Sequence, residues 1–182
     1  MQGLQLLRGL LCCGVFAAAS SRSPKNKPSI DCNPQTGDFV NMLKSMRQDY
    51  SRIRDTLHDR DKLHSSLLTG ALLDEMMGYS GCRTTLLLME HYLDTWYPAA
   101  YRHHLYDNQT LVVVDRMGST LVALLKAMVQ CPMLACGAPS PAMDKMLQQE
   151  AKMKKYTGVY KGISETDLLL GYLELYMMKF KR

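Results

Sequence analysis

The chain has 182 residues and a formal net charge of +5, and 47% of its residues are hydrophobic against 21% charged. This composition is typical of a globular protein and excludes a disordered or low-complexity chain. Three Phe and one Trp accompany 14 Met, which favours helix-on-helix packing of flexible side chains. Basic residues are spread along the chain beside acids, as at 59–62, and indicate solvated helix faces, not a nucleic-acid-binding stripe. An affinity for acidic glycans or anionic surfaces stays open.

The N-terminus has the pattern of a secretory signal. Arg8 is followed by an apolar run over residues 9–19, with small residues at Ala17 and Ala19 that fit a cleavage site. The run is shorter than the roughly 20 residues that span a bilayer. We therefore expect a signal peptide at 1–19, secretion, and no membrane insertion of the mature chain. The alternative is a short buried N-terminal helix.

Four cysteines remain after this segment, namely Cys32, Cys82, Cys131 and Cys136. An even number in an oxidising compartment predicts two disulfides, and three pairings are possible. The spacings do not fit a zinc site. Because Cys131 and Cys136 lie close together, we expect both bridges to tie distant segments to one point.

The rest of the mature chain shows apolar residues at helical spacing. An extended leader over 20–37 precedes a helix that Asp38 can cap. Pro98 is expected to end the third helix, before a loop over 98–108, and residues 137–142 (GAPSPA) form a stiff hinge. Gly158 is expected to stop the fifth helix, and Ser164 with Asp167 resembles a capping box for the last. The expected helices lie at 38–57, 63–77, 81–97, 111–128, 143–157 and 164–180, so the fold class is an all-α, six-helix bundle.

The sequence contains no arrangement of residues that indicates catalysis. It has no HExxH, GxSxG, P-loop or GxGxxG motif, and no thiol is left unpaired as a nucleophile. We therefore expect neither an enzyme nor a cofactor or metal site. Asn108-Gln109-Thr110 is an acceptor for N-glycosylation in a secreted protein, which we place in a loop.

Several motifs together resemble the interleukin-10 family. Residues 158–167 (GVYKGISETD) are similar to its G-[IV]-Y-K-A-[MI]-S-E-x-D segment, and 172–177 (YLELYM) continue the likeness. Residues 41–47 resemble its first helix and 78–82 (GYSGC) its G-Y-x-G-C. The run CPMLACG and the divergent middle look most like the cytomegalovirus-encoded homologues. A viral mimic is therefore our interpretation, and a fast-evolving cellular cytokine is the alternative.

The resemblance implies a six-helix cytokine domain over 38–182 with bridges Cys32–Cys131 and Cys82–Cys136. It also implies an intertwined homodimer, in which helices one to four of one chain pack with helices five and six of the other. A six-residue hinge reaches at most about 20 Å, which we expect to be too short for the last two helices to fold back. Exchange between protomers would then bury their apolar faces.

The family's function implies two receptor partners, a high-affinity interleukin-10 receptor chain and a shared chain, and immunosuppressive Janus kinase–STAT signalling. A decoy that does not signal, or an interferon-like monomeric cytokine, is the alternative. His58 and His64 depart from the family pattern, so their contacts are not carried over. The receptor contacts that carry over come from the first helix and from the region where the last begins: Lys44, Arg47, Arg54, Lys161, Ser164, Glu165 and Asp167.

Overall fold

The structure is a computed structural model that describes residues 37–129 and 139–179. The expected signal peptide, most of the leader and part of the hinge lie outside these residues, as do Cys32, Cys131 and Cys136. The described residues contain helices and no strand, which confirms the all-α fold class. The elements are α1 (Gly37–Arg60), α2 (Gly70–Met77), α3 (Gly81–His91), the π-helix η2 (Tyr92–Trp96), α4 (Tyr97–Arg102), α5 (Asn108–Val129), α6 (Pro141–Ala151), α7 (Thr157–Ser164) and α8 (Thr166–Met178).

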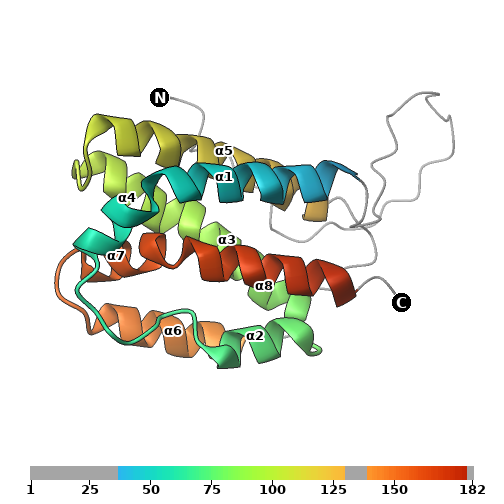
Figure 1. The fold of residues 1–182 in the computed structure, drawn as a ribbon. Helices are drawn as coiled ribbons and strands as arrows, with labels where there is room; N and C mark the ends of the chain where they lie inside the picture. Colours follow the sequence, from blue (N-terminus) through green and yellow to red (C-terminus); the bar gives the residue numbers. More distant parts are fainter. Residues whose placement is uncertain (1–36, 130–138, 180–182) are drawn as a thin grey trace, which may run out of the picture.

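The helices stack in layers around one core. α1 and α5 lie side by side, and α8 runs along α1 on its other side (Figure 1). α2 and α6 lie beyond α8, and α3 connects the layers by packing on α2, α5 and α6. None of the described helices is both long and apolar enough to cross a membrane.

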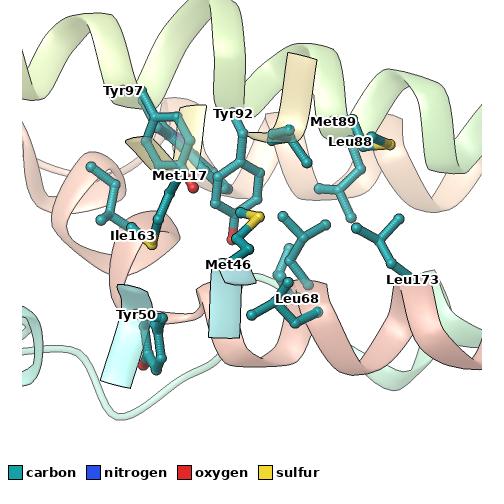
Figure 2. Packing of buried hydrophobic residues seen from close by; sticks show 14 of the residues in the cluster. Met46, Tyr50, Leu68, Leu88, Met89, Tyr92, Tyr97, Met117, Ile163 and Leu173 are labelled. Carbon is teal, nitrogen blue, oxygen red and sulfur yellow. The ribbon is translucent and has the colours of Figure 1, made fainter. Parts of the chain in front are cut away.

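The apolar face of α1 is buried as its periodicity predicts. Phe39, Leu43, Met46, Tyr50, Ile53 and Leu57 are all in the core. Side chains from three other elements pack around Tyr92 of η2, namely Met46 of α1, Met117 of α5 and Ile163 of α7 (Figure 2). The Tyr92 hydroxyl donates to the Gly162 carbonyl oxygen at 2.7 Å. This buried bond connects η2 directly to α7.

The last three helices pack on their own chain in this structure. α6 contacts α2 and α3, while α7 and α8 contact α1. The expectation that the hinge is too short for this packing is wrong, because the whole connection from α5 to α6 counts. It comprises residues 130–140, eleven residues, which can span about 37 Å when extended. Exchange of these helices between two chains therefore remains a prediction.

Pro98 does not end the third helix. The chain stays helical from Gly81 to Arg102, through α3, η2 and α4, and Pro98 lies in the first turn of α4. Proline cannot donate to the preceding turn, and the wider π turn re-pairs the carbonyl of Tyr92 with the Tyr97 N–H. The expected loop over 98–108 is correspondingly shorter, and His104 turns the chain with a positive φ of 47°.

Two glycines near the C-terminus allow close packing. Gly158 was expected to stop a helix but lies in the first turn of α7, while α6 already ends at Ala151. A Cβ at Gly158 would lie 2.7 Å from Cγ of Glu150, and one at Gly162 would clash with the Trp96 ring. The missing Cβ atoms thus let α7 approach α6 and η2.

Candidate functional site

One face of α1 carries an exposed row of basic side chains. Lys44, Arg47 and Arg54 are all exposed, and their spacing of three and seven residues places them along one side of a helix. The buried row of α1 lies on the neighbouring side. The helix therefore holds these charges toward solvent, as predicted. We call Lys44, Arg47 and Arg54 the α1 row.

The α1 row borders α8. The Arg47 guanidinium Nη2 lies 2.7 Å from Oε1 of Glu174, and the two side chains are 47% and 43% exposed. A half-exposed ion pair of this kind contributes at most about 1 kcal/mol to stability. Arg47 can therefore exchange Glu174 for another acid without unfolding the protein.

Tyr50 connects α1 to the junction of α7 and α8. Its hydroxyl donates to the Ser164 carbonyl oxygen at 2.7 Å and lies 3.1 Å from Nε2 of His58. Burial, and then the negative charge of Asp167, raise the pKa of Tyr50, while the positive charge of Arg54 lowers it. The phenol thus stays protonated. Tyr50 thus bonds α1 to the end of α7, and the charges of Arg54 and Asp167 both act on its phenol.

Three of the carried-over residues lie inside the protein. Lys161, Ser164 and Glu165 are buried, whereas Asp167 is exposed. The Lys161 Nζ lies 3.0 Å from Oδ2 of Asp61 and 3.3 Å from Oε1 of Glu165, and it donates to the Leu63 carbonyl at 3.0 Å. Lys161 thus lies between two carboxylates. We call Asp61, Lys161, Ser164 and Glu165 the buried cluster.

Glu165 fixes the segment between α1 and α2. Its Oε2 accepts the backbone N–H groups of Leu67 and Leu68, at 3.0 and 2.9 Å. The Tyr172 hydroxyl donates to the Leu68 carbonyl at 2.9 Å. These bonds pair the backbone of Leu67 and Leu68 outside a helix, and α2 begins at Gly70 and not at residue 63 as expected.

Asp61 is the member of the buried cluster that sequence reasoning missed. It was interpreted as part of a solvated charged run, but its side chain is only 8% exposed. Burial raises its pKa, but hydrogen bonds from the Leu63 N–H, the Ser164 hydroxyl and Lys161 outweigh this, and the net pKa is lowered. Burial lowers the pKa of Lys161, and the hydrogen bond to Asp61 with the charges of Glu165 and Asp61 outweighs it, so the net pKa is raised. Both groups are therefore charged at neutral pH.

The expected capping box at Ser164 is wrong. Ser164 is the last residue of α7, and its hydroxyl donates to Oδ2 of Asp61 at 2.8 Å. The first position before α8 is Glu165, which makes no side-chain cap. Asp167 accepts only from the adjacent Leu168 N–H, at 2.8 Å, and its side chain remains open to solvent.

The glycosylation motif begins α5 instead of lying in a loop. Asn108 is exposed at the first position of this helix. The Thr110 hydroxyl and N–H both donate to Asp107, at 2.6 and 3.0 Å. Asp107 therefore acts as the N-terminal cap of α5, and the side chain of Asn108 is open to solvent.

Cys82 is the cysteine of the expected bridges that lies within the described residues. Cys82, at the start of α3, is buried and is bonded in a disulfide. Since the other three cysteines lie outside the described residues, the pairing remains a prediction. Within residues 37–129 and 139–179, no three acids, histidines or cysteines are grouped in a way that could hold a metal ion.

The chain is similar to known cytokines over nearly all of its length. The family model Interleukin 10 matches residues 9–179. Interleukin-10 of Bos taurus is 32% identical over 92% of this chain and 94% of its own, and the viral interleukin-10 homolog of Equine herpesvirus 2 is 30% identical over the same shares.

A solved structure of human cytomegalovirus interleukin-10, bound to the soluble human receptor chain IL-10R1, is 32% identical to this chain. The match has a TM-score of 0.50 and covers 81% of this chain and 98% of the viral protein. Members of this family are receptor-binding signalling proteins and not enzymes. The chain thus belongs to the interleukin-10 family of helical cytokines.

Proposed function

We propose that this protein is a secreted, virally encoded cytokine that binds the high-affinity interleukin-10 receptor chain through the α1 row and Asp167. It then recruits the shared receptor chain and starts immunosuppressive Janus kinase–STAT signalling. The observation that carries the proposal is the likeness to cytomegalovirus interleukin-10, which is bound to IL-10R1 in its solved structure. Relatives encoded by a herpesvirus and by a mammal make mimicry of a host cytokine the natural interpretation.

The buried cluster has a supporting role in this proposal. Lys161, Ser164 and Glu165 were carried over as contacts, but their polar atoms are bonded inside the protein. We assign them to holding residues 61–69 and the start of α8 in place, beside the α1 row. Three basic side chains and one acid would then form a mixed surface. Such surfaces steer a partner of complementary charge and fix its orientation.

We further propose that the active form is an intertwined homodimer with bridges Cys32–Cys131 and Cys82–Cys136. In such a dimer the contacts of α6 with α2 and α3, and of α7 and α8 with α1, would form between chains. Light scattering of the purified protein should give the mass of two chains at micromolar concentration. A monomer would reject the dimer and favour an interferon-like arrangement. Intact-mass measurement after alkylation without reduction should find no free thiol.

The test of signalling is STAT phosphorylation in cells that carry both receptor chains, compared with cells that lack the high-affinity chain. We expect phosphorylation only in the first. Binding to the isolated high-affinity chain is measured in parallel. Binding without phosphorylation would mean that the protein is a decoy, and absence of binding would reject the receptor assignment.

A further inference from the structure

One carboxylate joins the last helices to the middle of the chain. Glu150, near the end of α6, accepts the indole N–H of Trp96 at 2.6 Å, and its other oxygen lies 2.7 Å from Nε2 of His91. The His91 and Trp96 rings meet edge to face, with 4.8 Å between their centroids. We call His91, Trp96 and Glu150 the carboxylate contact. It connects α6 to α3 and η2.

The carboxylate contact is largely shielded from water. The side chains of His91 and Glu150 are 14% and 17% exposed, and Trp96 is fully buried. Burial raises the pKa of Glu150, but the hydrogen bonds from His91 and Trp96 outweigh this, and the net pKa is lowered. Glu150 is therefore ionised at neutral pH, and both rings donate to it. Hydrogen bonds to an ionised group are about twice as strong as those between neutral groups.

The carboxylate contact lies outside the segments that carry the family resemblance. Those segments are residues 41–47, 78–82, 158–167 and 172–177. The buried cluster also joins the two parts of the chain, but three of its four members belong to the motif at 158–167. A relative with the same motif would therefore fit the buried cluster. The carboxylate contact can distinguish this chain from such a relative.

We propose that the carboxylate contact forms between two chains and selects a second copy of this chain as the partner. The proposal rests on the exchanged homodimer proposed above and adds the contact that decides which chains pair. In that dimer, α6 of one chain would lie on α3 and η2 of the other, so the carboxylate contact would occur twice. Its acid and its two donors would then always belong to different chains.

A polar contact of this kind discriminates between partners better than the apolar core around it. Apolar cores tolerate the exchange of one hydrophobic side chain for another of similar volume. A partner without an acid at position 150 would instead leave the donors of His91 and Trp96 without an acceptor inside the dimer, which costs free energy. Such a penalty against the wrong partner is a common source of specificity.

The test exchanges the charges of the carboxylate contact between two full-length chains. His91→Glu places two acids together, and Glu150→Lys places a lysine beside His91, so each variant alone should dimerise roughly tenfold or more weakly than wild type. In a mixed dimer, the introduced glutamate would face the introduced lysine, and the second contact would be the native one. The variants carry different tags and are secreted separately or together. Light scattering and sequential capture on both tags should then find mixed dimers at about the wild-type yield.

The matched controls are Lys126→Glu on α5 and Asp144→Lys on α6, which reverse the charges of exposed side chains outside the carboxylate contact. Each should dimerise alone like wild type. Equal losses in the controls would mean that net charge, and not this contact, governs assembly.

Two further outcomes would overturn the proposal at different levels. Wild-type chains with different tags that never purify together would reject the homodimer itself. Wild-type chains that do purify together, while the two variants either assemble alone or fail to rescue each other, would reject only the carboxylate contact. His91→Asp with Glu150→Arg repeats the exchange with other side chains, so that failure of both pairs to form mixed dimers is decisive.

Discussion

The α1 row and the buried cluster are made from the same kinds of residue, yet they have opposite environments. In the α1 row, Arg47 meets Glu174 at 2.7 Å with both side chains almost half exposed. In the buried cluster, Lys161 meets Asp61 at 3.0 Å with both side chains below 10% exposed. The distances are similar, but the free energies are not, because only the second pair has lost its water. Charged residues near a receptor surface can therefore act by contact or by support.

The difference predicts that Glu165→Ala is the most destabilising single change in either region. It removes the acceptor of the Leu67 and Leu68 N–H groups and one of the two acids beside Lys161. Breaking a buried charged network of this kind costs about 3–5 kcal/mol. Urea unfolding followed by circular dichroism measures the loss. The matched control is Glu174→Ala in the exposed pair, which should cost at most about 1 kcal/mol. Equal losses would remove the distinction between the two regions.

The second prediction concerns binding. Arg47→Ala should weaken binding to the high-affinity receptor chain roughly thirtyfold, as expected for an arginine at the centre of an interface. Surface plasmon resonance with the isolated receptor chain measures this, and the unfolding free energy should change by less than about 1 kcal/mol. Arg52→Ala is the control, since Arg52 is exposed on α1 and pairs with Asp49 outside the α1 row. A wild-type affinity for Arg47→Ala would remove Arg47 from the site.

A third prediction separates the regions by pH. Asp61, Glu75 and Glu150 all have pKa values that are lowered in the folded protein. A lowered carboxyl pKa stabilises the fold above the unfolded-state value, which is about 4 for these groups, and this stability is lost as the pH falls further. The unfolding free energy should therefore decline below about pH 4.5. Asp61→Asn should make that decline shallower, whereas Glu174→Gln should leave it unchanged.

The smallest effect is expected at Asn108. Its side chain is exposed at the start of α5 and belongs to neither region. Asn108→Gln should remove a glycan, which is seen as faster migration on a gel, and should leave receptor affinity unchanged. An unchanged mobility would mean that the site is not used, and a large loss of affinity would place α5 at the receptor.

Much of the fold could be predicted because apolar residues recur at regular intervals along a helix with one buried face. The buried face of α1 follows its spacing closely, and so does that of α5, where Leu111, Met117 and Leu121 are in the core. The helix ends were harder. Pro98 and Gly158 are residue types that often end a helix, but neither does so here. A π turn lets the helix continue into Pro98, and the close approach of Glu150 requires a glycine at position 158.

The candidate site could be predicted only where its residues are regularly spaced along one helix. The α1 row follows from residue spacing alone, since the position of the buried stripe defines which sides of the helix are exposed. The inward direction of the Lys161 and Glu165 side chains does not follow from residue spacing. It depends on Asp61, which lies 100 positions before Lys161. A partner that distant leaves no local signal in the sequence.

The contact of Gly162 with Trp96 makes the residues at these two positions depend on each other. The family motif has alanine at position 162, but a Cβ there would clash with the indole ring. A chain with alanine at position 162 could therefore keep Trp96 only if α7 or the indole ring moved. Transplanting the C-terminal helices of an alanine-containing relative into this protein should consequently fail unless residue 96 is exchanged in the same step.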